Sequence, residues 1–326
     1  MLGYGAALLH TLNHALFKSL LFLGAGVVHR ETGTRDMELL GGLARRLPVT
    51  WMLFVIGAAA IVGLPPLNGF VSEWLVYRTL LGAGGSTEPI RLAVLAVPAL
   101  ALVGGLALAC FAKVCGVVFL GNPRSARAVA AREPGALMRV PAIALAVACA
   151  VIGLAPFVVI PSMLLAGTYV AGTPVAPADA SALGASAGMW QLTAFAASVA
   201  LIGLAAVVVQ WWMRRRVGCR ESDTWGCGFT YTSPRMQYTA SSFAAPLIDV
   251  FGPMSGVRAH RGATVFHSEP FDLVLDRAVT PAWDAIRRAA IRLRRLQHGR
   301  LRHYLLYVIA TITMLLAYLL ATGRSR

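Results

Sequence analysis

Charged residues are scarce in this sequence. They make up 13% of its 326 residues, whereas 57% are hydrophobic and the mean hydropathy is +0.68. An ordinary soluble domain carries about 25% charged residues. No stretch shows the sustained alternation of polar and apolar residues that a membrane β-barrel requires. The composition therefore excludes a soluble globular protein and predicts an all-α, polytopic integral membrane protein.

Cysteine is also rare, and the five cysteines do not form a recognisable site. Cys110, Cys115 and Cys149 lie in apolar stretches, and Cys219 and Cys227 share a polar segment without CxxC spacing or paired histidines. This pattern does not support iron–sulfur ligation. No flavin, quinone or metal motif is visible either, so we expect this chain to hold no cofactor and no metal.

The apolar residues are concentrated in long runs. A bilayer core of about 30 Å requires roughly 20 apolar residues per helix. Six stretches qualify: 2–28, 49–81, 91–119, 139–165, 189–212 and 304–322. The first has no basic n-region and is too long for a signal peptide, so we expect a mature membrane helix there.

We expect four parts along the chain. The first, 1–120, holds three membrane helices, and 121–213 holds two peripheral ones. A basic cytoplasmic segment follows at 214–303, and a C-terminal transmembrane helix occupies 304–326.

The net charge of +15 is distributed by loop. Segments 29–48 and 120–139 carry four arginines each, 166–188 carries no lysine or arginine, and 214–303 carries 15 arginines against 7 acids. Because basic loops stay on the cytoplasmic side, this alternation predicts a multi-pass protein of a bacterial-type inner membrane with both termini outside. The lipid bilayer accounts for the charge, and we expect no nucleic-acid partner.

The second apolar stretch is interrupted by "GLPPLNGFVSEW". Pro65 and Pro66 remove two backbone donors, so we expect a helix break near 63–69. At membrane depth, a break persists only where protein or a water-filled cavity surrounds the freed backbone groups. A kink that only shapes packing is the alternative, but Glu73, within the same apolar stretch, favours a functional break.

Three ionisable residues, His10, His14 and Lys18, follow at steps of four in the first apolar stretch. On a helix they form one stripe about 12 Å long. Ionisable groups within a membrane are costly and commonly mark ion pathways, and histidine titrates near neutral pH. The stripe favours a proton relay over purely structural hydrogen bonding. Lys113, near the end of the third stretch, either snorkels to the interface or contributes weakly to such a relay.

An amphipathic helix is expected at 281–303, before the last span. Trp283, Ile286 and Leu293 lie on one helical face, with Arg288 and Arg292 on another. Such a helix lies on anionic lipid at the membrane surface. A lateral strut against neighbouring subunits is the alternative.

Five segments together resemble one known family: "HTLNHALFKSLLFLGAG", "TGTRDMELLGGLARRLP", "GLPPLNGFVSEW", "FAKVCGVVFLGNPRS" and "TWGCGFTYTSPRMQYTASSF". The family is that of the antiporter-like proton-translocating subunits of NADH:quinone oxidoreductase (complex I), group 4 hydrogenases and Mrp antiporters. The "SPRMQYTASSF" segment and the carboxylate of Glu73 favour the hydrogenase-4/formate hydrogenlyase branch.

The resemblance implies roles for the residues that match. Lys18 looks like the central lysine of the family's proton path, His10 and His14 like its hydrated companions, and Glu73 like the terminal group near the outer exit. The implied partners are other membrane subunits of a hydrogenase or NADH dehydrogenase-like complex, which would carry the redox chemistry.

The chain resembles only the last six of the family's helices, so an upstream half of the same subunit is a further expected partner. Proton translocation is thus the first hypothesis for function. Sodium/proton exchange of the Mrp type and a non-conducting membrane scaffold are the alternatives.

Overall fold

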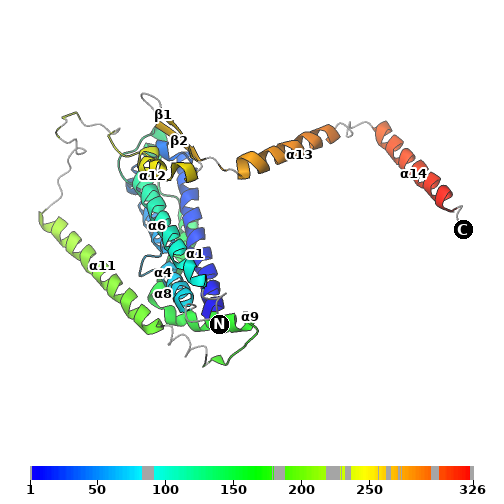
Figure 1. Cartoon of the computed structure of the whole chain (residues 1–326). Helices are drawn as coiled ribbons and strands as arrows, with labels where there is room; N and C mark the ends of the chain where they lie inside the picture. Colours follow the sequence, from blue (N-terminus) through cyan, green and yellow to red (C-terminus); the bar gives the residue numbers. More distant parts are fainter. Residues whose placement is uncertain are drawn as a thin grey trace. The chain divides into compact units, whose positions relative to one another are not determined.

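The computed structural model describes residues 2–82, 92–177, 179, 188–217, 228, 230–231, 236–255, 257–261, 266–270, 272, 274–294 and 301–323. They form two compact units, Met1–Ala244 and Ala245–Arg326. Helices dominate both units, which confirms the all-α prediction (Figure 1). Within the described residues, five helices are long and apolar enough to cross a membrane: Leu2–Thr32, Leu92–Phe119, Ala136–Leu154, Met189–Val217 and Tyr304–Thr322. The four-part division stays a prediction, and Cys219 and Cys227 lie outside the described residues.

Helix α1 (Leu2–Thr32) is the centre of the first unit. It packs against α3 (Pro48–Ile61), α4 (Asn68–Gly82), α8 (Ala136–Leu154) and α9 (Ile160–Val170). Glycines bring α1 and α9 together, because a Cβ on Gly167 would lie 2.5 Å from the Gly5 nitrogen. At its other end α1 stops at Gly33, whose φ of +66° suits glycine.

The second apolar stretch is broken as predicted, into α3 and α4. Gly63, in the connection, has a φ of +71°. A Cβ on Gly69 would collide with the carbonyl oxygen of Ala60, and one on Gly153 of α8 would collide with that of Pro66. Close backbone packing on both sides therefore holds the break in one conformation.

A carboxylate from a distant loop caps the start of α3. Pro48 occupies the first turn, where its missing N–H costs nothing. Glu133 accepts hydrogen bonds from the backbone nitrogens of Val49 and Thr50, both at 3.1 Å, and from Thr50 Oγ1 at 2.5 Å. The negative charge also complements the positive end of the helix dipole.

The fourth apolar stretch, expected as one span, is divided into two helices. Helix α8 ends at Leu154, a 3₁₀ turn spans Pro156–Val158, and α9 begins at Ile160. Pro156 and Pro161 supply the physical reason, because neither can donate a helical hydrogen bond.

Two further helices complete the spans of the first unit. Helix α6 (Ala96–Val114) continues into a π-helical turn, Cys115–Phe119. Helix α11 (Met189–Val217) carries two cation–π pairs near its basic end. Arg215 lies 4.0 Å from the Trp211 ring centroid and Arg216 lies 4.6 Å from that of Trp212.

Hydrogen bonds join three polar segments of the first unit: the loop that follows α1, the loop that follows the π-helical turn after α6, and the segment 237–241. Arg124 donates to the carbonyl oxygens of Met37 and Glu38 at 3.1 Å and of Val117 at 2.5 Å. Burial lowers the pKa of its guanidinium, and the nearby Glu38 carboxylate opposes that shift.

Gln237, from the described part of "SPRMQYTASSF", joins this assembly. Its side-chain amide bonds both backbone groups of Asn122, accepting from the nitrogen at 3.0 Å and donating to the oxygen at 3.1 Å. Ser241 N then donates to Glu38 Oε1 at 2.7 Å. These contacts give a physical reason for a motif that the sequence alone left unexplained.

The second unit contains two short strands that were not predicted, β1 (Val257–Arg261) and β2 (Phe266–Pro270), paired antiparallel. Helix α12 (Ala240–Ser255) precedes them. A π-helical turn (Leu275–Val279), α13 (Thr280–Leu293) and α14 (Leu301–Gly323) follow. Helix α13 covers the start of the expected amphipathic helix, and residues 295–300 lie outside the described residues.

Candidate functional site

The three ionisable residues of the first span lie along one flank of α1. The imidazole centroids of His10 and His14 are 6.4 Å apart, and the His14 ring meets Phe17 edge-on at 5.4 Å. Lys18 Nζ lies 5.6 Å from the ring centroid of Phe22. Within the first unit His14 is exposed, whereas His10 and Lys18 are partly covered. The stripe therefore borders the packed face of α1 without being enclosed.

His10 connects the stripe to α4. Its Nδ1 lies 3.2 Å from the hydroxyl oxygen of Ser72, a fully buried residue. The same hydroxyl is 3.0 Å from the carbonyl oxygen of Gly69. A hydroxyl has one hydrogen to donate, so when Ser72 donates to Gly69, the Nδ1 of His10 must carry the proton that completes the other bond. Ser72 directly precedes Glu73 in the chain.

Two asparagines hold the centre of the α1–α4 contact. Asn13 Nδ2 donates to the backbone oxygen of Asn68 at 2.8 Å, and Asn68 Nδ2 donates back to Asn13 Oδ1 at 3.1 Å. Both residues are 0% exposed. Among the described groups, Asn68 Oδ1 has no hydrogen-bond partner. Buried polar groups are nearly always paired. A water molecule that donates a hydrogen bond to this amide oxygen would satisfy it.

Glu73 lies at the break itself. A Cβ on Gly63 would collide with Glu73 Oε2 and would lie 2.8 Å from its Cδ. The carboxylate thus packs directly on the backbone of the connection between α3 and α4. The absence of a side chain at Gly63 creates the space that the carboxylate occupies.

The predicted residues are only partly brought together. His10 and His14 are neighbours, and His10 bonds the residue that precedes Glu73. In the described part of the chain, no hydrogen bond or ion pair joins Lys18 to Glu73, and none joins Lys113 to the stripe. Lys113 lies near the end of α6.

Sequence reasoning missed Asn13, Asn68 and Ser72, which are neutral. A signal was present, because Asn68 and Ser72 are four residues apart on α4 and Asn13 lies inside the histidine stripe.

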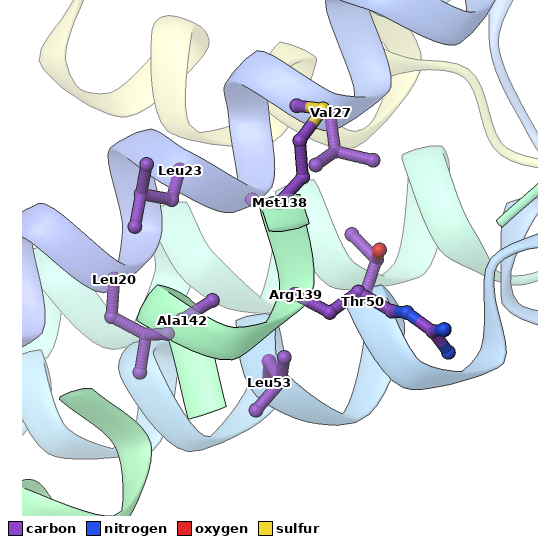
Figure 2. Close-up of a pocket in the computed structure, with 9 residues that line it drawn as sticks. Leu20, Leu23, Val27, Thr50, Leu53, Met138, Arg139 and Ala142 are labelled. Atoms are coloured by element: carbon purple, nitrogen blue, oxygen red, sulfur yellow. The ribbon is translucent and has the colours of Figure 1, made fainter. Parts of the chain in front are cut away.

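A small cavity of about 10 Å³ lies between α1, α3 and α8 (Figure 2). Arg139 runs past Thr50 at its edge, and Arg139 Nε is buried without a partner among the described groups. The cavity is large enough for one water molecule. Apart from Thr50 and Arg139, its walls are apolar: Leu20, Leu23, Gly24, Val27, Leu53, Met138 and Ala142. It can hold one water molecule near Arg139, but it is no open channel.

Several known proteins are similar to this chain in sequence. Residues 1–100 match the family model described as NADH:quinone oxidoreductase/Mrp antiporter, TM. Hydrogenase-4 component B of Escherichia coli (strain K12) is 34% identical over 97% of this chain and 50% of its own length. A subunit of the Na(+)/H(+) antiporter of Alkalihalophilus pseudofirmus is 50% identical over 24% of this chain and 10% of its own length.

One solved structure shares the fold over nearly the whole chain. It is the membrane-bound sulfane sulfur reductase, an archaeal respiratory membrane complex, with a TM-score of 0.59 at 20% identity, covering 97% of this chain and 48% of that one. The chain spans about half the length of hydrogenase-4 component B. It is a multi-pass membrane protein similar to antiporter-like subunits of membrane complexes, and its residues 1–100 match the NADH:quinone oxidoreductase/Mrp antiporter transmembrane family model.

Proposed function

We propose that this chain is a proton-translocating part of a membrane subunit in a hydrogenase-4/formate hydrogenlyase-like or NADH:quinone oxidoreductase-like complex, and that it relays protons through Lys18 toward Glu73. The observation that carries the proposal is the 3.2 Å contact between His10 and Ser72. It links a stripe of titratable groups on α1 to the broken helix that bears Glu73.

The spacing within the stripe suits stepwise transfer. A proton moves between groups in hydrogen-bond contact or through one intervening water. The 6.4 Å between the His10 and His14 rings leaves room for one such water. His14 and Lys18 are again one helical turn apart, about 6 Å along the axis. Lys18, His14 and His10 therefore form a chain of proton carriers that ends at the α1–α4 contact.

The direction of transfer follows from the charge of the loops. With the basic loops in the cytoplasm, α1 runs inward and the α3–α4 pair returns outward. Glu73 then lies in the outer half of the membrane. The proton enters Lys18 from the inner side through water and leaves outside from Glu73.

The exposed flank of the stripe supports a partner in the membrane. His14 is exposed within the first unit, and an ionisable group that faces lipid is costly. Another part of the same subunit, or a neighbouring membrane subunit, covers this flank in the assembled complex. Electron transfer belongs to such partners in this proposal, because the sequence shows no flavin, quinone or metal motif.

Lysine substitution in the assembled complex tests the proposal. Lys18 and Lys113 are the only two lysines in the sequence, so they form a matched pair. We expect Lys18→Ala to abolish substrate-driven proton uptake by inverted membrane vesicles and Lys113→Ala to retain most of it. Unchanged uptake by an assembled Lys18→Ala complex contradicts the proposal and favours a scaffold.

Sodium/proton exchange is the second candidate, and similarity to the Na(+)/H(+) antiporter of Alkalihalophilus pseudofirmus over 24% of the chain favours it. Complementation of a sodium-sensitive bacterial strain separates the two candidates. An exchanger restores growth at high sodium concentration, whereas a redox-driven proton pump does not.

A further inference from the structure

A second cavity of about 300 Å³ opens at the end of α1, away from the histidine stripe. Its walls come from α1, the loop that follows it, α3 and the end of α6. The apolar lining consists of Ala25, Val28, Met37, Leu40, Phe54, Val114, Val118 and Phe119, and the polar lining of His29, Thr34 and Arg35. The cavity is therefore apolar inside and basic on one side.

The apolar walls are held rigidly. Phe54 and Phe119 pack against each other as tilted rings with centroids 5.0 Å apart, and the Trp51 ring also contacts Phe119, with centroids 4.9 Å apart. Phe119 and Val118 belong to the π-helical turn that ends α6, and both are buried. The Arg124 guanidinium fixes the carbonyl oxygen of Met37. The cavity is thus part of the packed core of the first unit.

Basic groups gather at the mouth of this cavity. Arg35 and His29 are exposed, and no hydrogen bond or ion pair with another described residue engages the Arg35 guanidinium. Arg127 lies against the same loop, because a Cβ on Gly33 would be 3.2 Å from its Nη1. The neighbouring acid, Asp36, accepts a hydrogen bond from the backbone nitrogen of Glu38, and no ion pair joins it to Arg35 among the described residues. The mouth therefore presents the Arg35 guanidinium, whose donors are not engaged by a described residue, beside Arg127.

The position of the cavity fits the membrane interface. Ala25 and Val28 belong to the last turns of α1, and Val114 and Val118 to the end of α6, so the apolar part lies at the depth of acyl chains. Arg35 follows the end of α1, three residues beyond the candidate span Leu2–Thr32, and lipid phosphates lie just beyond the hydrocarbon core that such a span crosses. Polybasic sites next to a span attract anionic lipids, and arginine binds phosphate with paired hydrogen bonds.

From this arrangement we propose that the cavity binds an anionic phospholipid, with one acyl chain against the Phe54–Phe119 wall and the phosphate on Arg35. Binding of the lipid requires both the apolar interior of the cavity and the arginine at its mouth. A zwitterionic lipid with the same chains lacks the net charge that the mouth selects, and inorganic phosphate lacks the chain that fills the interior. The site is independent of the proton relay, because none of its lining residues belongs to the relay.

Thermal unfolding of the full chain in detergent tests the site. The purified, delipidated protein is titrated with phosphatidylglycerol or with phosphatidylcholine of identical acyl chains. We expect phosphatidylglycerol to raise the unfolding midpoint more than phosphatidylcholine does, and inorganic phosphate to leave it unchanged. We call the additional rise of the unfolding midpoint with phosphatidylglycerol, over that with phosphatidylcholine, the phosphatidylglycerol excess. Arg35→Gln should remove most of this excess. Arg132→Gln, which removes an exposed arginine outside the cavity, should keep it.

A second pair of variants tests the acyl-chain part. Ala25→Trp fills the cavity from its exposed edge and should remove the same excess. Gly26→Trp adds the same group at the next position, where a Cβ meets nothing within 4 Å, and should keep it.

Three results overturn the proposal. The first is an equal effect of the two lipids on the wild-type chain, which needs no variant to fold. The second is a full excess retained by Arg35→Gln or by Ala25→Trp. The third is an equal shift from inorganic phosphate alone.

Discussion

Substitution of Gly63 by alanine tests how the helix break positions Glu73. The change adds one Cβ at a residue with a φ of +71°, directly against the Glu73 carboxylate. A left-handed backbone costs a non-glycine residue about 1–2 kcal/mol. The new carbon also requires the carboxylate to withdraw by about 1 Å to reach van der Waals distance. Gly63→Ala therefore combines backbone strain with displacement of the proposed exit group.

The same chain offers a control for the strain alone. Gly172 has a φ of +70°, and a Cβ there would meet nothing within 4 Å. Gly172→Ala should lower the free energy of unfolding by the same ~1–2 kcal/mol without moving Glu73. Misplacement of a reacting group by about 1 Å can cost ~100-fold in rate. We therefore expect Gly63→Ala to slow substrate-driven proton uptake at least about tenfold and Gly172→Ala to leave it near wild type.

The assay is proton uptake by inverted vesicles that contain equal amounts of assembled complex, with the unfolding midpoint of each variant as the measure of stability. Equal uptake by Gly63→Ala and Gly172→Ala refutes the reasoning, because the Glu73 carboxylate would then not depend on the space at Gly63.

Three further predictions concern stability, each measured as the free energy of unfolding in mixed detergent micelles. Asn13→Ala should lower the free energy of unfolding by about 1–3 kcal/mol, because it leaves the side-chain amide of Asn68 unpaired. A double-mutant cycle between Asn13 and Asn68 should give a coupling energy of ~0.5–3 kcal/mol. Additive losses contradict the contact between the two side chains. Gln237→Ala should cost about 1–2 kcal/mol and speed proteolysis near Asn122, and unchanged proteolysis rules the contact out. Glu133→Ala should cost ~0.5–2 kcal/mol, more than Glu133→Gln, whose amide oxygen still accepts; equal costs argue against the cap.

The break in the second span could be predicted because its cause is local. Pro65 and Pro66 remove backbone donors wherever they stand in a helix. The same signal was available at Pro156 and Pro161, but the surrounding apolar run is long enough for one span and concealed the division into α8 and α9. Hydropathy measures length and polarity, and it does not distinguish one long helix from two short ones.

The stripe of His10, His14 and Lys18 could be predicted for a similar reason, because residues four apart in the sequence lie on the same side of a helix. Its partners were not visible. Asn68 and Ser72 become important only because α4 packs against α1 with the two asparagines opposite each other. Such a pairing depends on tertiary packing, which a single sequence does not contain. Gln237 is a further case, because its partner, Asn122, is 115 residues away.

The relay itself is tested most directly by the ratio of protons taken up to electrons transferred in assembled complexes carrying Lys18→Ala, Glu73→Gln or both. Groups that act in series on one path are not additive, because the path is already closed when one is lost. We predict that each single variant lowers the ratio and that the double variant lowers it no further. A wild-type ratio in either single variant, or a double variant whose loss is the sum of the two, contradicts a path from Lys18 to Glu73.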